Sequence, residues 1–223
     1  LGILGESGSG KSTTGRVLAG LLKPDSGMVR IEGNDVYADR RGREHLQNCL
    51  SIVFQDYTTS ANPRFTIQQV IAEGIAVGER KTREKVRYAD ETVRLLELVG
   101  LDGSFAWRFP HELSGGQLQR VCIARAIACK SKLILFDEAV SSLDAHTQVQ
   151  IMDLLLDLKE KLGLTYIFIT HDLTSITYFC SRVIFLKDGS VVADSSVKDL
   201  AKLDVPYAKE LLGAVLDFNA RCV

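Results

Sequence analysis

Residues Leu1–Leu4 (LGIL) run directly into Gly5–Ser12 (GESGSGKS), which matches G-x-x-x-x-G-K-[ST] at every fixed position. A short apolar run of this kind is typical of a buried parallel strand, and the pattern of Thr14–Leu22 predicts a helix after the motif. Strand, glycine-rich loop and helix in this order form a P-loop. A plain Gly/Ser turn is the alternative, and the complete match together with both flanking elements disfavours it.

The chemistry of the motif suits a nucleoside triphosphate. Its glycines let the backbone curl so that N–H groups face phosphate oxygens at the positive end of a helix dipole. Lys11 supplies a mobile positive charge for the β- and γ-phosphates, and the Ser12 hydroxyl can bind Mg²⁺. The residues expected to contact the nucleotide are Gly5, Glu6, Ser7, Gly8, Ser9, Gly10, Lys11, Ser12 and Thr13.

Composition limits the class of protein. The 223 residues are 46% hydrophobic and 25% charged, which is typical of a globular protein with one large domain or two small ones. The 27 basic and 28 acidic residues give a net charge of −1, so a protein that binds nucleic acid over its whole surface is disfavoured. No apolar run approaches the roughly 18 residues of a membrane-spanning helix. Any span is therefore expected in another chain or segment.

The cysteines indicate neither a disulfide framework nor a zinc knuckle. They are odd in number and widely spaced, without a C-x-x-C pair. We expect Cys122 and Cys129, seven residues apart, to be small core residues on one helix face. The cytosol is the expected compartment. The five cysteines are Cys49, Cys122, Cys129, Cys180 and Cys222.

Acidic residues follow a second apolar strand, Leu133–Phe136, at Asp137 and Glu138. Ligands of open α/β sheets bind outside the carboxyl ends of the strands, so we expect Asp137 beside the P-loop as an Mg²⁺ ligand. Glu138 is then placed to activate a water for attack on the γ-phosphate. Paired acids after a strand are also common as a helix N-cap. The P-loop upstream favours the catalytic interpretation.

A third apolar strand, Tyr166–Ile169, is followed by Thr170 and His171. A histidine at this edge of the sheet is positioned to contact the γ-phosphate or the attacking water. The other histidines, His45, His111 and His146, follow no such strand and are assigned no role.

A second site of anion-binding type lies at Leu113–Gln117 (LSGGQ). Ser114 is a helix N-cap, and the two glycines after it expose N–H groups at the start of a helix. One ATP needs one phosphate-binding loop, so the second site requires another explanation.

At this point the sequence resembles the ATP-binding cassette (ABC) ATPases, whose signature is L-S-G-G-Q, over essentially the whole chain. The resemblance implies an α/β fold of the P-loop NTPase (RecA-like) type, with a helical signature subdomain and a small β-rich portion. In this family two cassettes face head to tail, and each signature closes over the ATP bound to the other's P-loop. ATP and Mg²⁺ are the implied cofactors, and ATP hydrolysis is the implied activity.

The family pattern also implies roles for single residues. Glu138 resembles the catalytic base and His171 the switch histidine. Gln55 resembles the Q-loop glutamine, which senses Mg²⁺ and water and adjoins the membrane partner. The implied metal ligands are Ser12, Gln55 and Asp137. The residues implied to act on the facing cassette's nucleotide are Ser114, Gly115, Gly116 and Gln117, and Ser141–Asp144 resembles the D-loop, whose Asp144 lies near that cassette.

Finer markers resemble the peptide/nickel importer ATPases. They are the F-Q-D…N-P-R pattern of Phe54–Arg64, Phe109–Glu112 before the signature, and P-Y-x-x-x-L-L at Pro206–Leu212. Details near Leu118 and Glu138 favour the nickel type over the oligopeptide type. With only Cys222 after this tail, no iron–sulfur cluster is predicted. The implied partners are membrane-spanning permease subunits, a related second ABC ATPase subunit and, indirectly, an extracytoplasmic substrate-binding protein, with no nucleic acid.

We divide the chain into a core of residues 1–57 and 126–194, a helical subdomain of residues 58–125 and a helical tail of residues 195–223. Within these we expect β-rich stretches at Met28–Glu32 and Cys49–Phe54, and an amphipathic helix at Thr82–Leu98. A β-hairpin is expected over Val183–Ala193.

Leu1–Leu4 has the pattern of a buried strand from its first residue. We therefore expect the sequence to begin inside a domain, with N-terminal strands of the fold preceding it. The family's adenine-stacking aromatic residue would lie there. Stacking of this kind is worth about 1–3 kcal/mol, so we expect residues 1–223 alone to bind ATP weakly.

The sequence therefore predicts the ATPase subunit of an importer of peptides or of nickel and metal chelates, peripheral to the cytoplasmic face of the inner membrane. Three alternatives stay open: an ABC subunit for another cargo, a soluble ABC ATPase acting on ribosomes or DNA, and a nucleotide-dependent scaffold without turnover. Glu138 and His171 together argue against the scaffold. Copurification with membrane proteins favours transport, whereas copurification with ribosomes or DNA favours the soluble ATPase.

Overall fold

The computed structural model describes residues 1–212, so Cys222 and the end of the predicted tail lie outside the described residues. A six-stranded sheet forms its centre, in the order β4-β5-β6-β1-β7-β8. All neighbours are parallel except β7 and β8. The strands are β1 (Gly2–Leu4), β4 (Leu50–Val53), β5 (Leu133–Asp137), β6 (Thr165–Thr170), β7 (Arg182–Lys187) and β8 (Ser190–Ser196).

Side chains alternate between two apolar clusters on the two faces of this sheet. On β5, Ile134 and Phe136 belong to the larger cluster, whereas Leu135 belongs to the smaller one. On β6, Phe168 and Ile169 divide in the same way. This two-sided burial explains why the strands read as continuous apolar runs in the sequence.

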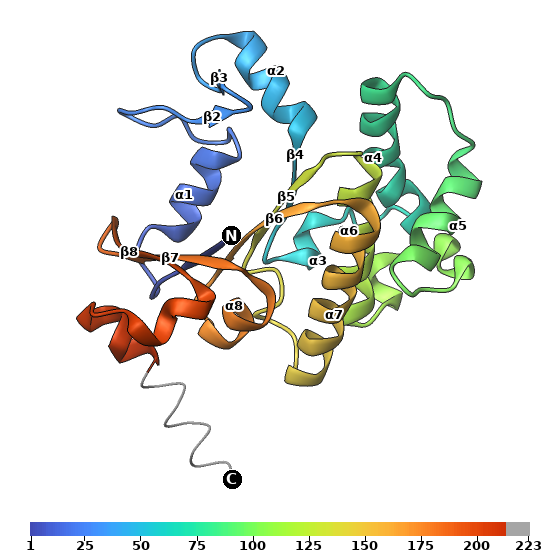
Figure 1. Ribbon diagram of the computed structural model, residues 1–223. Coiled ribbons are helices and arrows are strands. Elements are labelled where there is room, and N and C mark those ends of the chain that lie inside the picture. Colours follow the sequence, from blue (N-terminus) through green and yellow to red (C-terminus); the bar gives the residue numbers. More distant parts are fainter. Residues whose placement is uncertain (213–223) are drawn as a thin grey trace.

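Helices cover both faces (Figure 1). On one side α1 (Lys11–Leu18) contacts β5 and β6, and α2 (Arg40–Cys49) contacts β4. On the other side α6 (Gly115–Ala128) contacts β4, α8 (Leu173–Phe179) contacts β1 and β6, and α7 (Ala145–Leu162) contacts both of these helices. A separate short hairpin of β2 (Arg30–Ile31) and β3 (Asn34–Asp35) packs on α2.

A helical group stands beside the sheet, coloured from cyan to green in Figure 1. It contains α3 (Tyr57–Ser60), α4 (Ile67–Thr82) and α5 (Tyr88–Leu98), packed against α6. Helices α4 and α6 approach closely at Gly74, where a Cβ would lie 2.2 Å from the Arg125 carbonyl oxygen. The remaining helical turns are η1 (Gly103–Trp107), η2 (Pro110–Glu112) and η3 (Val197–Lys202).

Several predicted elements are confirmed. The strands at Leu133 and Tyr166 and the helix after Ser114 are present, and β7 and β8 form the predicted hairpin. The turn of this hairpin has positive φ at both Asp188 and Gly189, the geometry of a two-residue turn that matches strand twist. The division into core, helical subdomain and tail stays a prediction, and its boundary at residue 125 falls inside α6.

The predicted helix at Thr82–Leu98 is confirmed over Tyr88–Leu98, but its predicted start is wrong. Helix α4 ends at Thr82, Arg83 takes a left-handed φ of 61°, and α5 begins only at Tyr88. The carboxylate of Glu79 holds the intervening turn by accepting hydrogen bonds from the Val86 backbone N–H and the Tyr88 hydroxyl. The apolar spacing continues across two helices, so the sequence pattern does not reveal the break.

The first part of the chain also differs from expectation. The helix after the P-loop spans Lys11–Leu18 rather than Thr14–Leu22, because Gly20 turns the chain with a φ of 73°. The expected β-rich stretches Met28–Glu32 and Cys49–Phe54 contain β2 and β4, but between them lies α2, which was not predicted. Its first turn is capped by the Asp39 carboxylate, which accepts from the Gly42 N–H at 2.8 Å. Leu46 is the only strongly apolar residue of α2, so its periodic signal is weak.

No helix of residues 1–212 is both long enough and apolar enough to cross a membrane.

The packing predicts a large stability loss for Phe136→Ala. Its ring is fully buried and lies edge-on to Tyr166, with centroids 5.1 Å apart. We expect the free energy of unfolding to fall by about 3–5 kcal/mol, because the truncation leaves a cavity. Urea denaturation measures this loss. Trp107→Ala, at a side chain 71% exposed, is the control and should change stability by only about 0.5 kcal/mol. Equal losses in the two variants would contradict the packing described.

Candidate nucleotide-binding site

The P-loop connects β1 to α1 at the carboxyl-terminal edge of the sheet. Gly10 is the N-cap of α1 with a φ of 98°, a conformation that favours glycine, and no side chain caps the helix. The first N–H groups of α1 therefore have no partner within the helix and are available to an anion. The loop is also tied to the β7–β8 turn, since the Gly189 N–H donates to the Ser9 carbonyl at 3.1 Å.

Lys11 lies inside this loop. Its side chain is 4% exposed, and Nζ donates to the carbonyl oxygen of Glu6 at 2.7 Å. Burying an ammonium group costs free energy unless the group has hydrogen-bond partners. The Glu6 carbonyl is such a partner, and it keeps the positive charge of Lys11 beside the P-loop backbone.

Asp137 ends β5 with one carboxylate oxygen, Oδ1, buried and without a hydrogen-bond partner among the described residues. Burial raises the pKa of this carboxyl group, and repulsion by Glu138 acts in the same direction. The charges of Arg16 and Lys11 and a hydrogen bond from the Ser12 hydroxyl oppose the shift. An orphaned carboxylate oxygen beside a serine hydroxyl is the donor set that Mg²⁺ prefers, so these residues fit that ion.

Glu138 and His171 meet at the ends of β5 and β6. Nδ1 of His171 lies 3.1 Å from Oε2 of Glu138. Glu138 has a left-handed φ of 48°, held by its N–H donating to the Ile169 carbonyl at 2.9 Å. A non-glycine residue pays about 1–2 kcal/mol for this conformation, which aims its side chain away from the strand direction.

Both side chains line a cavity of about 400 Å³ together with the P-loop. The other lining residues are Gly5, Glu6, Ser7 and Leu211. The structure thus brings together the first half of the P-loop and the two residues predicted to be catalytic, although they come from three segments of the chain.

Gln55 is exposed just after β4. It is connected to Glu138 through one intermediate residue, Ser141. Its Nε2 donates to the Ser141 Oγ at 3.4 Å, and that hydroxyl donates to the Glu138 carbonyl at 2.9 Å. Ser141 was predicted only as part of a D-loop, so this connecting role was missed. Asp144, from the same segment, caps α7 by accepting from the Thr147 N–H at 3.0 Å.

Tyr207 is a second residue that the sequence did not point to as part of the site. It is buried, and its hydroxyl accepts a hydrogen bond from the Glu6 backbone N–H at 3.1 Å. The Lys187 ammonium lies over its ring at 4.6 Å from the centroid. The P-Y-x-x-x-L-L pattern was the available signal, but it indicated a subfamily rather than a contact.

The LSGGQ segment is not part of this cavity. The side chains of Ser114 and Gln117 cap the start of α6 reciprocally, at 3.3 Å and 2.9 Å. Ser114 is exposed, Gly115–Gln117 are partly exposed, and no hydrogen bond found for residues 1–212 joins them to the P-loop. This surface is accessible to another molecule.

A P-loop at the end of a central parallel strand, with an acidic pair on a second strand and a histidine on the next, defines a P-loop NTPase. Comparison with known proteins identifies the family within this class. The family model described as "ABC transporter" matches residues 1–141. The chain belongs to the ABC transporter family, as one of its ATP-binding, ATP-hydrolysing cassettes.

Relatives of known name are similar over most of their length. The metal-staphylopine import system ATP-binding protein CntF of Staphylococcus aureus is 41% identical over 98% of this chain and 85% of its own length. The oligopeptide transport ATP-binding protein OppF of Bacillus subtilis is 39% identical over 96% and 71%. Among solved structures, the cassette MJ0796, a dimer in a post-hydrolysis state bound to ADP and phosphate, superposes with a TM-score of 0.76. It is 32% identical, over 88% of this chain and 84% of its own.

The buried carboxyl group predicts a pH-dependent effect of Asp137→Asn in the nucleotide-free protein. The folded-state pKa is raised, so the stabilising contribution of this group is present at acidic pH and is lost as the pH rises through that pKa. At pH 7–8 the variant should therefore have a higher Tm than the native chain, and the gain should shrink towards pH 4. Thermal melts across this range measure the difference. Asp25→Asn, at an exposed position, is the control, and a lower Tm for Asp137→Asn at pH 7 would contradict the assignment.

Proposed function

We propose that this chain is the ATP-hydrolysing subunit of an ABC importer, which binds ATP at Gly5–Thr13 and hydrolyses it with Glu138. The carrying observation is the 3.1 Å contact between Glu138 and His171 on the wall of the cavity that the P-loop lines. A site that only bound nucleotide would not need a base and its hydrogen-bond partner at the γ-phosphate end.

In this proposal the P-loop binds the phosphates through its free N–H groups and Lys11. Ser12, Asp137 and Gln55 would hold Mg²⁺. The orphaned Asp137 oxygen supports this set, whereas Gln55 joins it on the family pattern alone. When bound, the ion neutralises charge on the β- and γ-phosphates.

Glu138 accepts a proton from the attacking water, and His171 orients the carboxylate and contacts the γ-phosphate. The hydrogen bond from Gln55 to Ser141 supports a connection between the reacting groups and the surface near β4. Gln55 is therefore proposed to sense the state of the site and to adjoin the membrane partner.

The signature acts on a second cassette. Ser114, Gly115, Gly116 and Gln117 present a helix N-terminus at an accessible surface, away from this chain's own P-loop. The dimeric state of the similar cassette MJ0796 supports such pairing. The subfamily resemblance favours a related subunit rather than a second copy as the partner.

The transported cargo is proposed to be peptides or nickel and metal chelates. The names of CntF and OppF support both cargo classes for relatives at about 40% identity. The chain would bind membrane-spanning permease subunits at the cytoplasmic face of the inner membrane, with an extracytoplasmic substrate-binding protein delivering the cargo. The finer resemblance near Leu118 and Glu138 favours the nickel type.

Glu138→Gln tests the catalytic role. The amide cannot accept the proton, so ATP hydrolysis by the assembled transporter should fall by about 10²–10⁴-fold while ATP binding is retained. Phosphate release and nucleotide binding measure the two quantities. Glu84→Gln, an exposed residue outside the site, should leave both unchanged. Undiminished hydrolysis in Glu138→Gln would remove this residue from its role.

Ser114→Arg and Lys11→Ala separate the two proposed nucleotide contacts. Lys11→Ala should weaken ATP binding by the isolated chain about tenfold or more, because it removes a charge from the phosphates. Ser114→Arg should leave that binding unchanged and reduce hydrolysis only in the assembled complex. If Ser114→Arg weakens binding by the isolated chain as much as Lys11→Ala does, the signature acts within its own chain and the pairing proposal is wrong.

A further inference from the structure

Three metal-binding side chains meet on the small β-hairpin side of the molecule, outside the nucleotide site. Nε2 of His45 lies 3.2 Å from Oε2 of Glu32 and 3.6 Å from Sγ of Cys49. Sγ of Cys49 lies 4.0 Å from the same Glu32 oxygen. In residues 1–212 this is the one group of three or more such ligands whose donor atoms all lie within 4.8 Å of one another.

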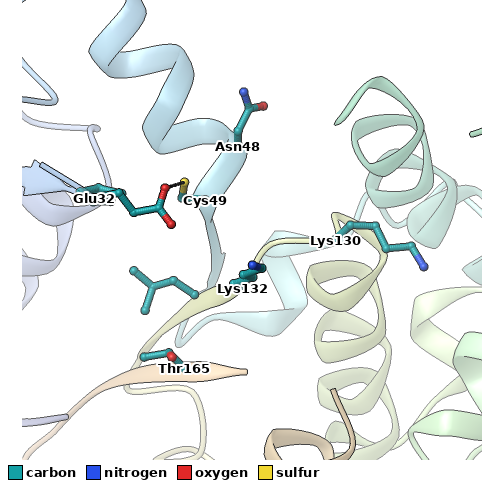
Figure 2. A pocket seen from close by; sticks show the side chains of 8 residues that line it. Glu32, Asn48, Cys49, Lys130, Lys132 and Thr165 are labelled. Atoms are coloured by element: carbon teal, nitrogen blue, oxygen red, sulfur yellow. Dashed lines mark hydrogen bonds between the residues drawn. The ribbon is translucent and has the colours of Figure 1, made fainter. Parts of the chain in front are cut away.

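The fold brings these side chains together from two elements. His45 and Cys49 are four residues apart on α2, so they lie on the same face of the helix. Glu32 lies in the turn between β2 and β3, and both strands contact α2. Figure 2 shows Glu32 and Cys49 extending towards each other from these separate elements. His45 was assigned no role from the sequence because it follows no strand end and has no metal-site spacing.

The spacing of the three donor atoms matches a tetrahedral metal site. With bonds of about 2.3 Å to sulfur and about 2.0–2.2 Å to nitrogen and oxygen, tetrahedral angles place the ligand atoms about 3.3–3.6 Å apart. The three distances here are 3.2, 3.6 and 4.0 Å. Small side-chain rotations close the difference.

We propose that Glu32, His45 and Cys49 bind one divalent transition-metal ion of the zinc class. A thiolate, an imidazole and a carboxylate are the ligands of such ions, whereas Mg²⁺ requires oxygen ligands in octahedral geometry. The site is therefore chemically distinct from the magnesium site proposed at Asp137, and it does not depend on the importer function.

The surroundings leave a fourth coordination position open. Glu32 and Cys49 line a pocket of about 580 Å³ that also contains Lys130, Lys132 and Thr165. The Lys130 ammonium is directed away, as Figure 2 shows, to a contact with Glu91 at 3.4 Å. A water or a small exchangeable ligand can occupy the open position, so the bound ion is expected to exchange.

Charge at the site also favours a cation once the thiol ionises. Burial and the Glu32 carboxylate raise the pKa of Cys49, while the charges of Lys81 and Lys132 oppose this shift. The thiolate is the form that binds metal, so metal binding displaces the thiol proton. The carboxylate and thiolate together then balance the charge of a divalent ion.

Cobalt titration of the reduced, metal-free full chain tests the proposal. In the absence of nucleotide, Co²⁺ should produce a sulfur-to-cobalt charge-transfer band that saturates at about one ion per chain. Zn²⁺ should remove the band, whereas excess Mg²⁺ should not. Calorimetry of Zn²⁺ binding in two buffers of different ionisation enthalpy should show release of about one proton.

Variants locate the site. Cys49→Ala should abolish the band, and His45→Gln and Glu32→Gln should each weaken metal binding about tenfold or more. Cys129→Ser and His146→Gln are the matched controls and should bind as the native chain does. The three ligands are exposed or half-buried, and circular dichroism checks that each variant folds.

Absence of the charge-transfer band in the native chain would overturn the proposal, and this result needs no variant. Persistence of the band in Cys49→Ala would do the same. Unchanged affinity in both His45→Gln and Glu32→Gln would show a lone thiol binding metal non-specifically, which also contradicts a three-ligand site.

Discussion

Burial of β5 and β6 on both faces is the constraint on which the site depends. A slip of one residue in the register of β5 would exchange Leu135 and Phe136 between the two apolar clusters, which the packing does not allow. The fixed register sets Asp137 opposite Ile169 and lets the Glu138 N–H reach the Ile169 carbonyl. Core packing thereby positions the carboxylates and His171 at the edge where β1 delivers the P-loop.

The parts of the site that follow directly from buried strands could be predicted from the sequence. Gly5–Ser12, Asp137 and His171 each come immediately after an apolar run, and the carboxyl ends of parallel strands meet at one edge. Contacts between distant segments could not be predicted. Nothing local indicates that Ser141 links Gln55 to Glu138. Likewise, α2 has too few apolar residues for a periodic signal, and the turn after Thr82 depends on tertiary bonds to Glu79.

The P-loop cavity and the LSGGQ segment lie at different places on the molecule, and the fold determines this separation. Gly5–Ser7, Glu138 and His171 line one cavity, whereas Ser114 caps a helix at an accessible surface. The P-loop cavity offers donors from one side of a bound triphosphate. In the proposed pairing, the helix end held by the Ser114–Gln117 cap would supply the complementary face for a neighbouring cassette. The proposed pairing thus requires two half-sites on one chain rather than one complete site.

The hydrogen bond between Glu6 and the Tyr207 hydroxyl joins positions 201 residues apart. With Leu211 on the cavity wall, it makes residues near the C-terminal end of the described chain part of the nucleotide site. A fluorescent label attached next to Leu211 would therefore lie beside this cavity rather than at a remote position.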